Sequence, residues 1–337
     1  MEYDIIGDIH GNAHALNHLL EKLGYRRAGG GWSSPQNRMI IFLGDFIDRG
    51  EGQMEVVSTA RSLIDSGRAL AVMGNHELNA ISWHMGHRPD NCKNRNQHKE
   101  FLAQVGERSE RHAEIVDWFL TLPLWLDLPE LRVIHACWDP SSLEVLKHSL
   151  VDERLTRDQI ATATVGKSNS IACDGSRPKE NELFSAVETI LKGIEIDLPA
   201  GISFPDKDGN KRHSVRLKWW YQPPASYARA AMAPLPKVSA LDAPLPEGVL
   251  PGYDNRKPLF IGHYWMTGEP RLLTPKIACV DYSAGKGGPL IAYRWRGEVE
   301  LVPDGFVSAQ ALALRPERFA WTDKEAEEIF KKAIREQ

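Results

Sequence analysis

The sequence has few cysteines and lacks long apolar runs. Its 337 residues include four cysteines, and no two of them have a Cys-x-x-Cys spacing. We therefore expect neither a disulfide framework nor a thiolate zinc site, but reduced thiols in a cytoplasmic protein. No segment approaches the roughly 18 apolar residues of a membrane span, and no charged segment followed by an apolar stretch marks a signal peptide, so we expect no membrane partner.

Neither sign of charge is in clear excess. The chain has 41 lysines and arginines against 45 aspartates and glutamates, and its formal net charge is -4. Because no global basic excess favours polyanions, nucleic acid is not an expected partner, although the sequence does not exclude it. The length predicts about two domains, or one large α/β domain with an insertion.

Three glycine-containing turns, each directly after an apolar run, dominate the N-terminal part of the chain. The runs Tyr3–Ile6, Met39–Leu43 and Ala69–Met73 predict buried strands. The turns therefore place Asp and His side chains at the carboxyl ends of strands, where open α/β sheets bind ligands. The turns are Gly7-Asp8-Ile9-His10-Gly11, Gly44-Asp45-Phe46-Ile47-Asp48-Arg49-Gly50 and Gly74-Asn75-His76-Glu77.

Helical patterns alternate with these strands. Ala13–Gly24 and Gln53–Ser66 have helical apolar spacing, which predicts a mostly parallel sheet covered by helices. Leu131–Ala136 predicts another buried strand. We further expect helices at Asn96–Leu122, Asn181–Gly193 and Thr322–Gln337. A second, more antiparallel sheet is expected from Pro258–Gly262, Ile277–Asp281, Leu290–Trp295 and Val299–Val302.

Residues 141–257 differ in character from the rest of the chain. Prolines crowd the second half of this region, which favours extended, looping chain over core elements. We interpret 141–257 as an insertion that caps or lines the active site. A flexible linker is the alternative interpretation.

Six side chains at these strand ends form a candidate set of metal ligands. Asp8 and His10, alternate residues of one turn, can face one cation, and the Asp45 carboxylate can bridge two. One amide oxygen and two histidines that also follow apolar strands complete the set: Asn75, His135 and His263. Two divalent cations about 3.5–4 Å apart can share a bridging hydroxide and clamp both oxygens of an in-line displacement at phosphorus. Mixed Asp, Asn and His ligation suits Mn²⁺, which we expect, or Fe²⁺ or Zn²⁺, better than Mg²⁺ or Ca²⁺.

His76 lies next to a candidate ligand and is expected to act as the catalytic acid. A protonated imidazole can give a proton to the leaving alkoxide. Asp48 can hold the tautomer of His76 and raise its pKa, so we count it as catalytic too. Arg49 can form two hydrogen bonds to phosphate oxygens, and we expect it to bind the substrate phosphate together with Asn75.

These motifs resemble those of the calcineurin-like metallophosphoesterases, and within them a bacterial branch similar to the serine/threonine protein phosphatases. That branch carries GDxHG, GDxxDRG and GNHE before two later ligand histidines, and all three motifs are present here unaltered. The resemblance implies an α/β fold, a four-layer α/β/β/α sandwich across residues 1–337 with the insertion at 141–257. It also implies a dinuclear metal centre, a hydroxide nucleophile, His76 as the acid paired with Asp48, and Arg49 as a phosphate ligand.

Departures from the branch concern the substrate rather than the metals. Met73 replaces a basic residue, and His135 is not followed by two glycines. Tyr264 and Trp265 directly follow a candidate ligand, so we expect them to line the substrate pocket, with core packing as the alternative. The branch has a further phosphate-binding arginine, for which the candidates are Arg216 and Arg229.

We expect a metal-dependent phosphoesterase that hydrolyses phosphomonoesters on a protein or a small molecule. The alternatives are a nucleotide or dinucleoside polyphosphate hydrolase, a nucleic-acid end phosphatase, and a degenerate phosphatase that serves as a binding scaffold. The scaffold predicts a missing ligand, and none is missing. A nucleic-acid enzyme would use a basic and aromatic cluster whose other interpretation is a hairpin ending in buried tryptophans: Lys207, Lys211, Arg212, Arg216, Lys218, Trp219, Trp220 and Tyr221.

Overall fold

The computed structural model describes residues 1–28, 31–35, 37–166, 169–177, 181–206, 209–221 and 224–310. The expected helix Thr322–Gln337 and the basic residue Lys207 lie outside the described residues. In the described part of the chain, no helix has both the length and the apolar character that crossing a membrane requires.

The first sheet contains the three predicted N-terminal strands. They are parallel, with β4 between β1 and β5, and they span Glu2–Ile6 (β1), Arg38–Phe42 (β4) and Ala69–Ala71 (β5). Two antiparallel strands extend the sheet beyond β1, in the order β15 (Ile291–Trp295) and β16 (Phe306–Ser308).

The second sheet is built around another set of parallel strands. Its centre is β12 (Leu259–Ile261), which is parallel to β7 (Arg132–Ile134) on one side and β14 (Ile277–Cys279) on the other. Antiparallel strands close both edges, β6 (Trp125–Asp127) next to β7 and β13 (Leu272–Thr274) next to β14.

The alternation of apolar side chains along the strands separates two cores. Ile5 and Ile41 of the first sheet pack against Phe260 of the second in a core between the sheets. Their neighbours Ile6 and Phe42 face the other way, toward helices. Such double-sided burial is typical of strands covered on both faces.

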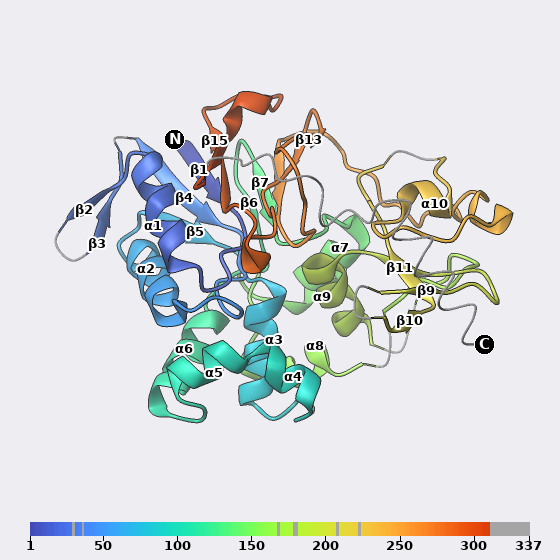
Figure 1. Cartoon of the computed structure of the whole chain (residues 1–337), viewed down its shortest axis with the longest axis horizontal. Helices are drawn as coiled ribbons and strands as arrows, with labels where there is room; N and C mark the ends of the chain where they lie inside the picture. Colours follow the sequence, from blue (N-terminus) through green and yellow to red (C-terminus); the bar gives the residue numbers. More distant parts are fainter. Residues whose placement is uncertain are drawn as a thin grey trace.

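Helices cover the outer face of each sheet. In Figure 1, α1 (Ala13–Lys22) and α2 (Gln53–Asp65) lie on the side of the first sheet, and α7 (Pro140–Ser149) and α9 (Glu182–Lys192) on the side of the second. Apolar residues of all four helices join the outer core. The predicted α/β/β/α sandwich is therefore confirmed.

The remaining elements surround the sheet edges. Below the sheets in Figure 1, four helices form a cluster: α3 (Asn75–His84), α4 (Cys92–Gln97), α5 (Lys99–Val105) and α6 (Glu110–Leu120). The predicted helix Asn96–Leu122 is thus three helices. The short β2 (Arg26–Ala28) and β3 (Gly31–Ser33) form a hairpin. Within 141–257 the chain also forms α8 (Ile160–Thr164), β8 (Glu195–Asp197), β9 (Phe204–Pro205), β10 (Lys211–Arg212), β11 (Ser214–Arg216) and α10 (Tyr227–Ala230).

Three expectations for the C-terminal strands were wrong. The runs Pro258–Gly262 and Ile277–Asp281 were expected in a more antiparallel sheet, but they form β12 and β14, which pair in parallel. The run Leu290–Trp295 forms β15, which pairs with β1 in the first sheet rather than contributing to the second. Val299–Val302 is not a strand; Val299 and Val302 are exposed, and β15 pairs instead with β16. A local apolar pattern predicts a strand but not the strand with which it pairs. Pairing depends on contacts between residues far apart in the sequence.

Candidate metal centre

The predicted ligands gather where the carboxyl ends of the two sheets meet. Asp8 and His10 follow β1, Asp45 follows β4, and His135 and His263 follow β7 and β12. The backbone angle φ is +50° at both His10 and Asp45, and +70° at His263. Left-handed backbone is uncommon for residues other than glycine, and such strain concentrates at functional sites.

Asp45 lies at the centre of three imidazoles. Its Oδ2 is 3.7 Å from Nε2 of His10 and 3.9 Å from Nε2 of His76, and its Oδ1 is 3.6 Å from Nε2 of His135. Burial raises the pKa of Asp45, but the neighbouring imidazoles of His135, His76 and His10 and the backbone N–H of His76 lower it more, and the pKa lies below its usual value. The carboxylate is thus ionised, with Oδ2 facing His10 and His76 and Oδ1 facing His135.

Backbone carbonyls orient the ligand histidines. Nδ1 of His10 donates to the carbonyl oxygen of Ile47 at 3.0 Å, and Nδ1 of His135 donates to that of Leu43 at 2.7 Å. When the proton of each ring is on Nδ1 alone, this leaves the Nε2 lone pair directed at the centre.

Asn75, the first residue of α3, completes the second group. Its Oδ1 lies 3.2 Å from Nε2 of His135. Both atoms are acceptors when the proton of His135 is on Nδ1, so a cation between them satisfies both.

Two overlapping groups of side chains have the spacing of a metal site. The first contains His10, Asp45 and His76, and the second contains Asp45, His135 and His263. Within each group the ligand atoms lie within 4.8 Å of one another. Asp45 is common to both groups, so one carboxylate lies within reach of both candidate sites.

Unpaired buried atoms show that the residues fit divalent cations. Oδ1 of Asp8 and Nε2 of His10 are buried and have no hydrogen-bond partner. Burial, together with Asp281 and Asp45, raises the pKa of Asp8 well above its usual value, and burial lowers the pKa of His10 to about 3. Clustered carboxylates and neutral imidazoles without donors are satisfied by metal ions of mixed N/O preference.

The predicted acid and its partner are in direct contact. Nδ1 of His76 lies 2.5 Å from Oδ2 of Asp48, and both side chains are buried. Burial lowers the pKa of His76, but the charge of Asp45 and the hydrogen bond to Asp48 raise it more, and the net shift is upward. Nε2, on the opposite side of the ring, is therefore the nitrogen that can transfer a proton.

Glu77 joins the second and third motifs, a role that the sequence reasoning missed. Its Oε2 accepts the backbone N–H groups of Asp45 (2.7 Å) and Gly74 (3.0 Å), and its Oε1 accepts that of Phe46 (2.9 Å). Glu77 thereby fixes the turn that carries the shared ligand. Its place in the Gly-Asn-His-Glu motif was the available signal.

Arg49 and Trp265 lie together beside His10. The guanidinium carbon of Arg49 is 4.2 Å from the indole centroid of Trp265, and Nζ of Lys286 is 4.1 Å from it. The backbone N–H of Trp265 donates to Oδ2 of Asp281 at 2.7 Å. Trp265 is partly exposed, so it lies at the mouth of the site.

Tyr264 and the tryptophan pair belong to the core. Tyr264 is buried, and a Cβ on Gly193 would lie 2.4 Å from its hydroxyl oxygen. Its ring contacts Trp220, and Trp219 has an exposed fraction of 0%. Core packing therefore holds for Tyr264, and buried tryptophans cannot stack on the bases of a nucleic acid.

Of the two candidate arginines, only Arg216 reaches the centre. Its Nη1 donates to Nε2 of His263 at 2.9 Å, and its Nη2 donates to Oε1 of Glu195 at 2.9 Å. Arg229, on α10, instead lies 6.0 Å from the ring of Tyr221.

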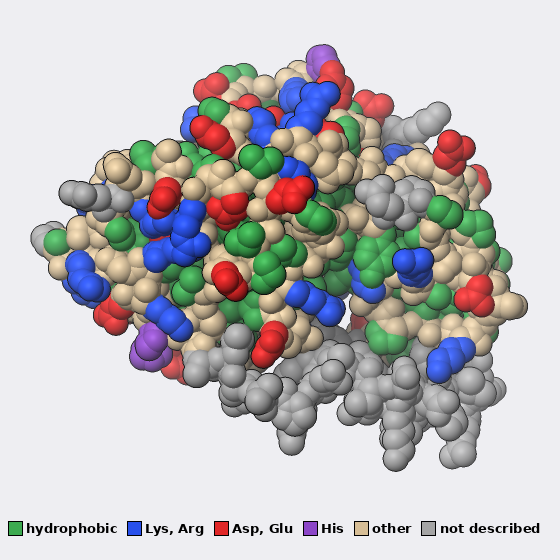
Figure 2. All heavy atoms as spheres, turned by 90° about the horizontal axis from the view of Figure 1, so that it is seen from above, with side chains coloured by type: hydrophobic (Ala, Val, Ile, Leu, Met, Phe, Trp, Pro, Cys, Tyr) green, Lys and Arg blue, Asp and Glu red, His purple; other side chains and the backbone are tan. Residues whose placement is uncertain are grey.

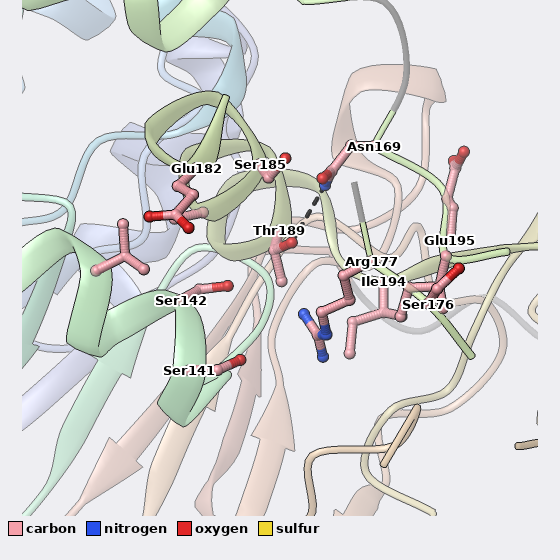
Figure 3. Close-up of a pocket in the computed structure, with 13 residues that line it drawn as sticks. Ser141, Ser142, Asn169, Ser176, Arg177, Glu182, Ser185, Thr189, Ile194 and Glu195 are labelled. Atoms are coloured by element: carbon pink, nitrogen blue, oxygen red, sulfur yellow. Dashed lines mark hydrogen bonds between the residues drawn. The ribbon is translucent and has the colours of Figure 1, made fainter. Parts of the chain in front are cut away.

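A cavity of about 300 Å³ lies apart from the ligands, between α7, α9 and β8. Figure 3 shows serines of α7 and Thr189 of α9 facing it. Arg177 lines it and pairs with Asp139 at 3.2 Å. Its connection to the centre is indirect, through Glu195 and Arg216.

Residues 1–159 match the family model described as calcineurin-like phosphoesterase. The bis(5'-nucleosyl)-tetraphosphatase PrpE [asymmetrical] of Halalkalibacterium halodurans is 29% identical over 139 residues, which is 40% of this chain and 55% of that protein. The protein of the same name from Oceanobacillus iheyensis is 30% identical over the same shares of the two chains. The match spans about half the length of these relatives.

Two solved structures align with more than nine-tenths of the chain. A cold-active protein-tyrosine phosphatase from a Shewanella species has a TM-score of 0.45 and 16% identity, covering 92% of this chain and 80% of that one. A protein serine/threonine phosphatase from Saccharomyces cerevisiae has a TM-score of 0.45 and 14% identity, covering 94% of this chain and 82% of that one.

Proposed function

We propose that the chain is a dinuclear-metal hydrolase of phosphate esters, because residues 1–159 match the family model described as calcineurin-like phosphoesterase. One observation carries the proposal. Two groups of buried side chains that could hold cations share Asp45, and His76 of the first group is bonded to the buried Asp48. The set of Asp8, His10, Asp45, Asn75, His135 and His263 would hold the cations, for which we propose Mn²⁺.

Metal ions, a proton donor and two arginines would each supply one part of the reaction. Two divalent cations bound here would lower the pKa of a water molecule and neutralise charge on the phosphate. His76 holds a proton on Nε2 for the leaving oxygen, because Asp48 occupies its Nδ1. Arg49 at the mouth and Arg216 at His263 are the proposed phosphate contacts, since a guanidinium can form two hydrogen bonds to phosphate oxygens.

We propose phosphomonoesters as the first substrate class. A positioned proton donor serves a leaving group that departs as a basic alkoxide, as in a phosphomonoester of serine or of a sugar. The protein or small molecule that carries the phosphate is left open by this argument.

Dinucleoside polyphosphates are the second candidate. The relatives named as bis(5'-nucleosyl)-tetraphosphatases favour them, and the partly exposed Trp265 beside His10 offers an aromatic surface near the reacting phosphate. Nucleic acid is a weaker candidate, because Trp219 and Trp220 are buried and the face in Figure 2 carries both signs of charge interspersed.

We further propose that the part of 141–257 after α9 lines the site. Arg216 on β11 contacts His263, and Trp220 packs against Tyr264. The four cysteines are unpaired, with Cys137 and Cys279 buried, and we propose the reducing cytoplasm as the location.

The test is Mn²⁺-activated hydrolysis of a matched panel. The panel contains p-nitrophenyl phosphate, bis-p-nitrophenyl phosphate, a phosphoserine peptide, mononucleotides and diadenosine tetraphosphate. Preference for the phosphopeptide or another monoester supports the first class, and preference for the dinucleotide supports the second. No hydrolysis of any of them with Mn²⁺, Fe²⁺ or Zn²⁺ contradicts the proposed function.

A further inference from the structure

A second histidine contacts the carboxylate that holds the proposed acid. Nδ1 of His98 lies 3.0 Å from Oδ1 and 2.9 Å from Oδ2 of Asp48. His98 has an exposed fraction of 0% and lies between α4 and α5, far in sequence from the three motifs. Asp48 is therefore placed between two imidazoles, His76 on one side and His98 on the other.

The contact is specific rather than general packing. In the described part of the chain, the hydrogen bonds to the Asp48 carboxylate come from these two rings, and its backbone N–H donates to Gln53 at 2.7 Å. Burial raises the pKa of Asp48, but the charge of His98 and the hydrogen bonds of His76 and His98 hold it well below its usual value. Since a carboxylate oxygen accepts only, Nδ1 of His98 must be the donor.

Without His98, the Asp48 carboxylate could rotate away from His76. A carboxylate held by one donor rotates about its terminal torsion, which is broad for Asp. Nε2 of Gln97 already lies 3.5 Å from Nδ1 of His76. If Asp48 rotated, its hydrogen bond to Nδ1 of His76 would break. The His76 ring could then turn, and its Nε2 would no longer face the leaving oxygen.

We propose that His98 is a positioning residue, which fixes the Asp48 carboxylate so that His76 keeps its proton on Nε2 facing the leaving oxygen. The inference rests on the proposed function, because it assigns His98 to the same proton transfer. It goes beyond the motifs, because His98 belongs to none of them.

A pair of amide variants separates positioning from packing. In His98→Asn the amide nitrogen occupies nearly the place of Nδ1, so the bond to Asp48 is kept. In His98→Gln the longer side chain carries its amide past that place, and in His98→Ala the donor is gone. His112→Asn is the matched control, because His112 is also 0% exposed and lies on α6.

The experiment measures kcat and KM for phenyl phosphate and p-nitrophenyl phosphate in the Mn²⁺-loaded protein, and the proton resonance described below in the Zn²⁺-loaded protein, because Zn²⁺ is diamagnetic. With phenyl phosphate we expect kcat to fall about tenfold in His98→Gln and His98→Ala, and KM to stay within about twofold. With p-nitrophenyl phosphate, whose leaving group needs less protonation, we expect a fall of about threefold or less. His98→Asn and His112→Asn should stay within about threefold of the wild type on both esters.

Equal losses on both esters, a change in KM alone, or no difference between His98→Asn and His98→Gln would overturn the proposal. A second readout does not need turnover. The low-field proton resonance of the bond between His76 and Asp48 should be present in the wild type and in His98→Asn, and absent in His98→Gln. If the wild type hydrolyses neither ester, and none of the wider panel with Mn²⁺, Fe²⁺ or Zn²⁺, the proposed function fails. This resonance alone then decides the role of His98: unchanged in His98→Gln, it contradicts positioning.

Discussion

Replacing His76 with Asn distinguishes a proton donor from a metal ligand. The contacts of His76 are consistent with either role. Nδ1 is bonded to Asp48 at 2.5 Å, so the free Nε2 can donate to a leaving group. The same ring also belongs to the group of His10 and Asp45 that could hold a cation.

The size of the effect follows from the donor role. General acid catalysis typically contributes 10²–10⁴-fold, and the Asn amide can still hydrogen-bond to the leaving oxygen without transferring a proton. We therefore expect kcat for phenyl phosphate to fall about 100-fold, which is about 2.7 kcal/mol in activation free energy. For p-nitrophenyl phosphate the fall should be less than about tenfold, because its leaving group is stable as an anion.

The assay combines steady-state kinetics with metal analysis of the purified protein. His76→Asn should keep the metal content of the wild type, as should the control His112→Asn. Loss of a metal equivalent would make His76 a ligand. Equal losses of kcat on the two esters would refute its role as the acid.

Three further substitutions test the neighbouring residues. Asp45→Asn should weaken metal binding and nearly abolish turnover, because it removes the charge shared by both ligand groups; wild-type metal content in this variant would contradict the shared role. Glu77→Gln should lower metal affinity by about 10–100-fold, because its NH₂ group would face a backbone N–H that the carboxylate now accepts; calorimetric titration with Mn²⁺ measures this. Arg49→Lys should raise KM by about tenfold with a smaller change in kcat, because a point charge replaces a two-pronged donor; an unchanged KM would remove Arg49 from phosphate binding.

The gathering of the candidate ligands could be predicted because each lies next to a strong local signal. Asp8, Asp45 and Asn75 each follow a short apolar strand and a glycine, and His135 and His263 directly end such strands or follow their glycine. Parallel strands bring their carboxyl ends to one edge, so the sequence pattern implies proximity in space.

The contacts of His98 and Arg216 with this site could not be found in that way, although Arg216 was one of the two candidate arginines. His98 lies at a break between two short helices, and Arg216 ends a three-residue strand paired with β8. Their contacts with Asp48 and His263 depend on how distant elements pack, which no local pattern encodes. The same limit explains β15, whose apolar run was recognised although its pairing with β1 was not.

The most direct test of the account is a metal titration. The protein is stripped with a chelator, and Mn²⁺ is added stepwise while bound metal and p-nitrophenyl phosphate hydrolysis are measured on the same samples. The account predicts no activity without metal, and full activity only at two bound ions per chain. Full activity at one ion per chain, or activity that survives metal removal, would contradict a dinuclear centre built on Asp45.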